Sequence, residues 1–125
     1  MESTVFLATQ ATFIELAKVD HLVFKFEVYK AFLGLSGKNA SDFSSDTACR
    51  LGKWYQGVGK SLFAKLDGYS QLERPHQLVH QCGQEAVAKL RANDLAGGSA
   101  LLAKMESAST EVIDCLNRIS ASTRI

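Results

Sequence analysis

The chain has 125 residues, of which 46% are hydrophobic, so it is long enough for one domain with a hydrophobic core and too short for two. We therefore expect a single domain over residues 1–125. Lys and Arg number 14 and Asp and Glu number 13, which gives a formal net charge of +1. This balance argues against binding to a nucleic acid or to an anionic membrane surface.

The chain also lacks the marks of an exported or membrane-inserted protein. It begins MESTV, with an acidic residue where a secretory signal has a basic one, and charged residues interrupt its longest apolar stretch. The cysteines number 3 and include no Cys-x-x-Cys pair, so a disulfide framework is not expected. These features predict a cytoplasmic protein that is not inserted directly into a membrane.

The helical period is clearest in the first part of the chain. From Ser3 to about Gly34, inward-facing residues recur every three or four positions, as on one face of a long helix. The glycines at Gly34 and Gly37 are expected to end this helix. The residues on the predicted face are Phe13, Ala17, His21, Phe24, Val28, Ala31 and Leu35.

Two short elements are expected in the middle of the chain. Residues 36–46 are rich in Ser, Asn and Asp, which predicts a loop. Asp46 is a good N-cap residue, so we predict a short helix from there to about Gly57 that carries Cys49. Residues 57–70 are broken by glycines and predict about one helical turn between loops.

Two longer helices complete the chain. The first is expected to begin between Ser70 and Pro75, because proline is tolerated in a first turn, and to end at about Asn93. Residues 93–99 predict a turn or a weak helix start before the last helix. The inward-facing positions of the two helices are His76, Val79, His80, Gly83, Val87 and Leu90, and then Leu102, Met105, Ser109, Val112, Leu116 and Ile119.

No segment alternates with period two for long enough to predict a strand. Three long helices and one or two short ones predict an all-α fold. Its architecture is expected to be an antiparallel four-helix-bundle-like domain with one short helix that carries the cysteine.

All the histidines of the chain fall on predicted inward faces, although imidazole is polar. His76 and His80 are four residues apart on one helix, so their rings project side by side, a spacing that suits two ligands of one metal ion. His21 lies near the middle of the first helix, and Cys49 lies in the short one. One thiolate and three imidazoles form a four-coordinate set of the kind that zinc accepts.

Spacing alone leaves two interpretations open. The same residues can be hydrogen-bonded histidines and a small apolar cysteine in the core of an ordinary bundle. A His-x-x-x-His pair on a helix also arises by chance, and the bundle is expected under either interpretation.

The order of the motifs favours the zinc interpretation. The sequence reads DHLVF around His21, then CRLGKW from Cys49, then HQLVH from His76 to His80. This pattern resembles the chemoreceptor zinc-binding domain (CZB) family, which is found in bacterial chemoreceptors and diguanylate cyclases. The resemblance extends from about Phe13 to Leu116.

The resemblance implies that His21, Cys49, His76 and His80 are the ligands of a zinc ion. It also implies a helical bundle that forms a homodimer and is joined to an upstream signalling or output domain of the same chain. Four further residues are expected beside the site, as neighbours of the ligands or as its walls: Asp20, Phe24, Gly52 and Trp54.

Three functional classes remain to be compared. An enzyme is not expected, because four protein ligands close a zinc site and the chain has no His-Glu-x-x-His general base. The resemblance implies a sensory domain, which responds to zinc or to an oxidant such as hypochlorous acid that attacks the zinc-bound thiolate of Cys49. The alternative is a purely structural role, in which zinc is a staple of a dimerisation module.

Overall fold

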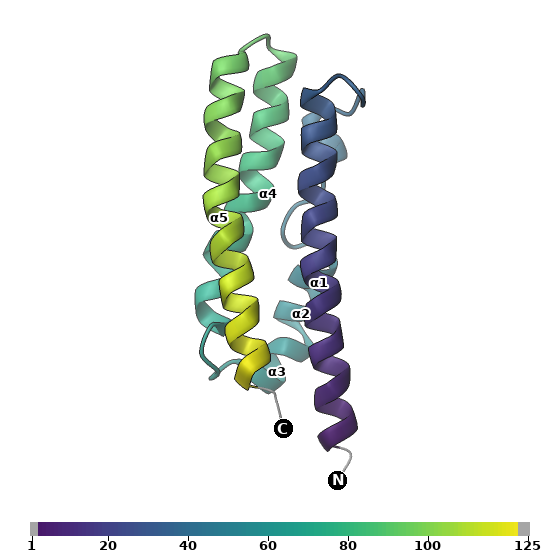
Figure 1. The fold of residues 1–125 in the computed structure, drawn as a ribbon, viewed down its shortest axis with the longest axis vertical. Coiled ribbons are helices and arrows are strands. Elements are labelled where there is room, and N and C mark those ends of the chain that lie inside the picture. Colours follow the sequence, from purple (N-terminus) through teal and green to yellow (C-terminus); the bar gives the residue numbers. More distant parts are fainter. Residues whose placement is uncertain (1–2, 123–125) are drawn as a thin grey trace.

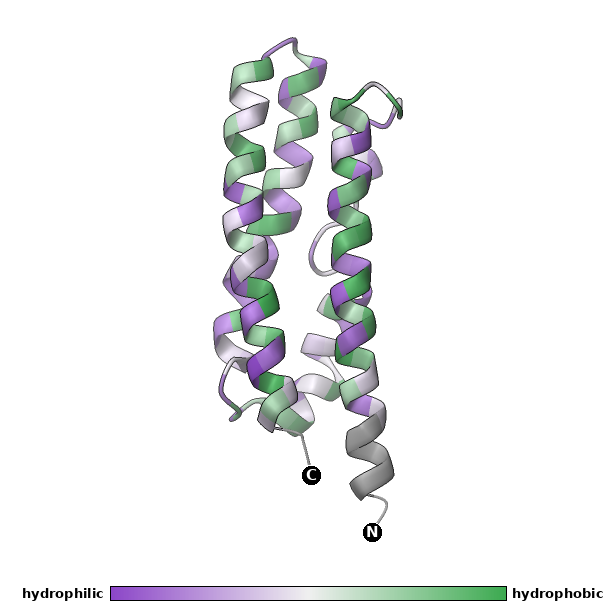
Figure 2. Ribbon diagram, in the orientation of Figure 1, coloured by the Kyte–Doolittle hydropathy of each residue, from purple (hydrophilic) through white to green (hydrophobic). Residues whose placement is uncertain are grey.

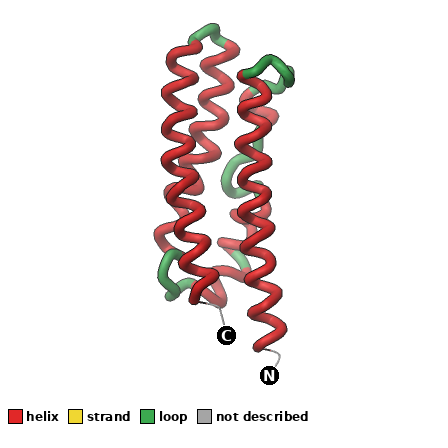
Figure 3. Tube along the Cα trace, in the orientation of Figure 1, coloured by secondary structure: helices red, strands yellow, loops and turns green. Residues whose placement is uncertain are grey.

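The structure, a computed structural model, describes residues 3–122. Within these residues the chain forms α-helices and one short 3-10 helix, and no strand (Figure 3). The all-α prediction is therefore confirmed. The elements are α1 (Ser3–Phe32), η1 (Ala40–Asp42), α2 (Arg50–Gln56), α3 (Val58–Phe63), α4 (Tyr69–Arg91) and α5 (Leu95–Ser122).

The three long helices lie side by side and set the long axis of the molecule (Figure 1). α1 and α4 run in one direction and α5 runs back beside them. Residues 33–63 return along the bundle as loops, η1, α2 and α3, so this broken segment takes the place of a fourth long helix. The arrangement is the four-helix-bundle-like architecture that was expected. Residues 33–63 take the place of the fourth helix and lie next to α1 and α4.

α1 ends close to the predicted position because glycine adopts a left-handed conformation there. Gly34 has φ of 75°, and its N–H and that of Leu35 donate to the carbonyls of Ala31 and Lys30. This pair of bonds is a Schellman-type cap, which satisfies carbonyls that the helix leaves open. Leu35, which was expected on the inner face, lies beyond the helix and is 70% exposed.

α2 begins later than predicted. Its N-cap is Cys49 and not Asp46, since the Cys49 Sγ accepts a hydrogen bond from the Gly52 N–H at 3.4 Å. The cysteine therefore precedes the short helix instead of lying within it. The predicted helical turn in the glycine-rich stretch is α3.

α4 begins at Tyr69, one residue before the predicted range, so Pro75 lies in its second turn and not its first. Gly68, with φ of 95°, precedes the helix, and the Gln71 Oε1 accepts a hydrogen bond from the Gly68 N–H at 3.1 Å. This bond stabilises the helix start without a proline there. The start of α5 is capped by Asp94, whose Oδ1 accepts from the Gly97 N–H at 2.9 Å.

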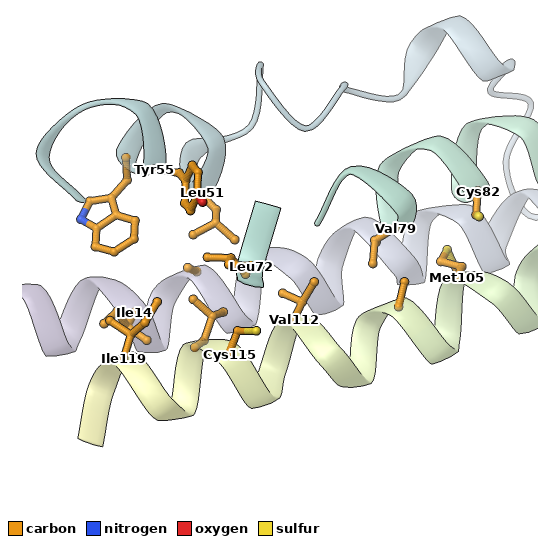
Figure 4. Packing of buried hydrophobic residues seen from close by; sticks show 14 of the residues in the cluster. Ile14, Leu51, Tyr55, Leu72, Val79, Cys82, Met105, Val112, Cys115 and Ile119 are labelled. Carbon is orange, nitrogen blue, oxygen red and sulfur yellow. The ribbon is translucent and has the colours of Figure 1, made fainter. Parts of the chain in front are cut away.

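The core lies between the long helices and under α2. Figure 4 shows Ile14 of α1, Val112 and Ile119 of α5 and Leu51 of α2 in this core, and each is at most 3% exposed. The predicted inner faces of α4 and α5 are confirmed except for Leu90 and Leu102, which are partly buried. In the described part of the chain, no helix has the length and apolar character needed to cross a membrane.

Candidate metal centre

A cavity of about 300 Å³ lies where α1, α4 and the segment before α2 meet. All the histidines of the chain and one cysteine line it, together with both apolar and charged side chains. The lining residues are Ala17, Asp20, His21, Val23, Phe24, Ser44, Cys49, Arg50, Leu51, His76 and His80. The residues of the predicted ligand set therefore share one cavity.

Cys49 enters this cavity from the N-terminus of α2. Its Sγ lies 3.3 Å from the Asp46 carbonyl and accepts a hydrogen bond from the Gly52 N–H. Burial raises the pKa of the Cys49 thiol, although the N–H groups of Gly52 and Leu51 oppose that shift. The thiol is therefore protonated at neutral pH in the absence of a metal, while its N–H donors are already placed to stabilise a thiolate.

Gly52 is required by the backbone that leads into Cys49. A Cβ on Gly52 would lie 1.8 Å from the Asp46 carbonyl oxygen, which is far inside contact distance. The space beside Gly52 is filled by the preceding loop of the same chain. The close approach holds the loop against α2 and fixes where Cys49 enters the cavity.

His76 and His80 meet Cys49 in one cluster. Candidate ligand atoms of the three residues all lie within 4.8 Å of one another. The Cys49 Sγ is 3.2 Å from the His76 Nε2, and the two imidazole rings lie at 84° with their centroids 4.8 Å apart. The four-residue spacing on α4 thus places both rings on one side of the helix, as the sequence predicted.

A backbone carbonyl fixes the orientation of His80. The His80 Nδ1 is 2.8 Å from the Ser44 carbonyl oxygen, which can only accept, so Nδ1 carries the proton and Nε2 carries a lone pair. The Phe24 ring packs on His80 with the centroids 4.3 Å apart, as expected for a residue at the wall. A metal-binding histidine commonly has its other nitrogen held in this way.

His21 lines the cavity from α1 but does not belong to the cluster of three. It is 4% exposed, and its Nε2 is buried with no hydrogen-bond partner among the described residues. Burial, together with the charge of His80, lowers the pKa of His21 to about 4. Burial likewise lowers the pKa of His76 to about 3, so both rings are neutral at pH 7.

These observations fit a zinc ion. Neutral imidazoles and a thiol that can lose its proton are the donors that zinc takes, and a buried Nε2 without a partner is costly unless something binds it. Bond lengths of about 2.3 Å to sulfur and 2.0–2.1 Å to nitrogen place tetrahedral S and N ligands about 3.6 Å apart. The observed 3.2 Å between Cys49 Sγ and His76 Nε2 is close to that separation.

The other residues expected at the site lie differently. Asp20 lines the cavity, and the partner that the structure gives it is Arg50, in an ion pair at 3.0 Å, and not a histidine. Trp54 lies away from the lining residues; its Nε1 donates to the buried Gln10 Oε1 at 2.9 Å and its ring stacks on Phe13. The aromatic side chain of Trp54 therefore fastens α2 to α1, and the apolar wall from α2 is Leu51.

Two contributors to the site were missed by the sequence analysis. Ser44 acts through its backbone carbonyl, which carries no residue-specific signal. Arg50 follows Cys49 directly and pairs with Asp20, the residue before His21, so the ion pair joins α1 to α2 beside two candidate ligands. A charge pair across 30 residues cannot be recognised from the spacing of either residue.

Comparison with known protein families agrees with this geometry. The family model of the chemoreceptor zinc-binding domain matches residues 21–87, which is more than half of the 125-residue chain. The match is narrower than the Phe13–Leu116 span of the resemblance, and it contains all four candidate ligands. No curated protein and no solved structure matches the chain.

The close contact at Gly52 predicts the effect of adding one methyl group. Gly52→Ala should lower the free energy of unfolding by about 1–3 kcal/mol, because the Asp46 carbonyl and α2 must separate. Urea unfolding of the metal-free protein measures this. Gly37→Ala is the matched control, since a Cβ there meets nothing within 4 Å. Equal losses in the two variants would contradict the assigned role of Gly52.

The buried neutral histidines predict an acid-sensitive metal-free protein. Their pKa values are about 4 for His21 and about 3 for His76 in the folded state, against 6.5 for the unfolded chain. Below pH 6.5 the unfolded state binds more protons, so stability is complete above that pH and falls as the pH drops toward 4. At pH 5 each of these histidines should lower the free energy of unfolding by about 2 kcal/mol relative to its value at neutral pH.

Urea unfolding at pH 7 and pH 5 in the presence of a chelator checks this. His76→Gln removes one titrating group, so its free energy of unfolding should fall less between pH 7 and pH 5 than that of the wild type. An unfolding midpoint that is the same at both pH values would show that the histidines are not buried as neutral rings.

Proposed function

The chain belongs to the chemoreceptor zinc-binding domain family, and from this membership we propose that it is a zinc-binding regulatory domain of a bacterial signal-transduction protein. The proposed zinc ligands are His21, Cys49, His76 and His80. The observation that carries the proposal is the cluster of Cys49, His76 and His80, with candidate ligand atoms within 4.8 Å of one another. The buried Nε2 of His21, which has no hydrogen-bond partner in the described part of the chain, lies on the same cavity and supports its place in the set.

A regulatory role follows from where these residues lie. His21 is on α1, Cys49 is at the start of α2, and His76 and His80 are on α4. A ligand set drawn from three segments resists their separation, so loading the site changes how α1 and α2 pack on α4. Four protein ligands leave no open position for a substrate water, which favours regulation over catalysis.

The signal is zinc, or an oxidant such as hypochlorous acid acting at Cys49. A bound zinc ion would hold the Cys49 sulfur as a thiolate, which is the reactive form. The thiolate sulfur attacks the chlorine of hypochlorous acid and releases hydroxide, and water then converts the sulfenyl chloride to a sulfenic acid, releasing chloride and a proton that the hydroxide takes up. This product is a poorer ligand than the thiolate, so α2 loses its link to the histidines.

The proposed domain acts on an output that lies outside it. We place it in a chemoreceptor or a similar signalling protein, joined to an upstream signalling or output domain of the same chain. A cytoplasmic location is supported by Cys49, Cys82 and Cys115, which are all free thiols.

We further propose that the domain is a homodimer. The support is a row of apolar residues along α1 that the bundle does not cover, with 48–72% of each residue exposed. The first four recur at steps of three and four and the last follows after seven, the spacing of a coiled-coil seam, and Figure 2 shows hydrophobic residues recurring along this helix. The residues of this α1 seam are Leu16, Val19, Val23, Phe26 and Leu33.

A second candidate function is a structural one, in which zinc holds a dimerisation module together without signalling. The buried histidines favour it, since they stabilise the fold only when something binds them. The two functions differ in the metal-free state: a sensor stays folded without zinc, whereas a stapled module loses helicity broadly.

The purified protein should bind about one zinc ion per chain, and Cys49→Ala should weaken binding more than about 100-fold, because even residues that only orient a ligand contribute 10–100-fold. Competition with a chelator measures the affinity, and far-UV circular dichroism of the metal-free protein separates sensor from staple. Cys115→Ala is the control, since Cys115 is buried outside the cavity. Unchanged zinc binding in Cys49→Ala would refute the proposed site.

The α1 seam predicts the dimer contact. The double variant Val19→Glu and Phe26→Glu should convert the dimer to a monomer, because like charges would face each other in a buried interface. Sedimentation equilibrium measures the molecular mass. Leu62→Glu on α3, where the leucine is 45% exposed, is the control and should leave the dimer intact. A wild-type protein that is monomeric at high concentration would contradict the proposal.

A further inference from the structure

The carboxylate of Glu106 on α5 holds two residues of α1. Its Oε1 accepts a hydrogen bond from the Lys25 Nζ at 3.0 Å, and its Oε2 accepts one from the Tyr29 hydroxyl at 2.5 Å. Glu106 lies outside residues 21–87, the part of the chain that the family model matches. We call these three residues the α1–α5 clamp.

The clamp is continuous with the candidate metal centre. Lys25 and Tyr29 follow His21 by four and eight residues, so the three side chains lie in a row on one side of α1. Lys25 lies one helical turn after His21 on α1, so the clamp begins beside this candidate ligand. The clamp therefore fixes the rotation of α1 within two turns of His21.

The two bonds of the clamp require a negative charge on Glu106, because of the environments of Lys25 and Tyr29. Only 14% of the Lys25 side chain is exposed, so its ammonium needs a counter-charge. Burial and the bond to Glu106 raise the pKa of Tyr29 to about 12, so the phenol stays protonated and donates. Charge-assisted bonds of this kind are shorter and stronger than neutral ones.

We propose that Glu106 is a positioning residue for zinc: through Lys25 and Tyr29 it holds α1 in the rotation that directs His21 at the cluster of Cys49, His76 and His80. This inference rests on the proposed zinc-binding function. Without the clamp, zinc itself would have to draw α1 into place, and part of its binding energy would be lost in doing so.

Two variants test the clamp. Glu106→Gln should weaken zinc binding about tenfold, the lower end of the loss seen for residues that orient metal ligands. Tyr29→Phe removes one bond without changing any charge and should weaken binding several-fold. Glu111→Gln, on the exposed side of the same helix, removes the same charge as Glu106→Gln and should bind zinc as the wild type does.

Hydrogen exchange of the metal-free proteins provides a second readout. Amides of α1 should exchange faster in Glu106→Gln and Tyr29→Phe, while those of α4 and α5 stay as protected as in the wild type. Weaker zinc binding with unchanged α1 exchange would overturn the positioning role and assign the effect to the charge alone. Zinc binding equal to that of Glu111→Gln would overturn it as well.

The same experiment separates the two proposals. If the wild type binds no zinc, the proposed function fails, whereas faster α1 exchange in Glu106→Gln would still establish the clamp. If the wild type binds zinc tightly and both clamp variants match it, the zinc site stands and the role of Glu106 is refuted.

Discussion

Three buried imidazoles and a partly buried thiol in one cavity are the constraint on which the rest of this structure depends. His21, His76 and His80 are each 4% exposed, and burial lowers the pKa of each of them. Each ring must remain neutral and find a partner for its lone pair, or it costs stability. The Ser44 carbonyl accepts a hydrogen bond from the Nδ1–H of His80, but the Nε2 of His21 has no partner among the described residues. The cavity is thus prepared for a ligand that bonds to lone pairs, which a metal ion does.

The fold meets this constraint with elements of unequal rigidity. α4 and α5 form a hairpin along most of their length, and α4 carries two of the candidate ligands (Figure 1). α1 and the N-cap of α2 carry one each; besides buried side chains such as Ile14 and Leu51, they are held by the α1–α5 clamp, the Asp20–Arg50 ion pair, and the bond from Trp54 to Gln10. Of these contacts the Asp20–Arg50 pair is exposed, and an exposed ion pair breaks at lower free energy than a packed hairpin. The candidate ligands therefore link the α4–α5 hairpin to α1 and α2, which pack on it less extensively.

Periodicity in the sequence was enough to predict the long helices and the inward direction of every histidine. The reason is that a 3.6-residue repeat depends only on residue type and spacing. The start of α2 could not be predicted in this way. Its N-cap is Cys49, whose sulfur accepts a hydrogen bond from the Gly52 N–H, whereas an aspartate such as Asp46 is the more usual N-cap residue. The part played by Gly52 and the place of Trp54 depend on a loop and a partner helix, which spacing does not fix. Glu106 had no local signal, because it meets Lys25 from 81 residues away.

In the proposed sensor, a change at the candidate ligands would be transmitted through α1 to the α1 seam. His21 lies on the covered side of α1, whereas Val19 and Val23 of the α1 seam lie two residues away on either side and are each 54% exposed. Because these residues share one helical turn, a rotation of α1 that moves His21 also turns the seam. The α4–α5 hairpin would resist the same rotation, so under the proposed function a change at the candidate metal centre would be expressed mainly at the seam. A partner packed on the seam would thus experience the state of Cys49 and the histidines without contacting any of them.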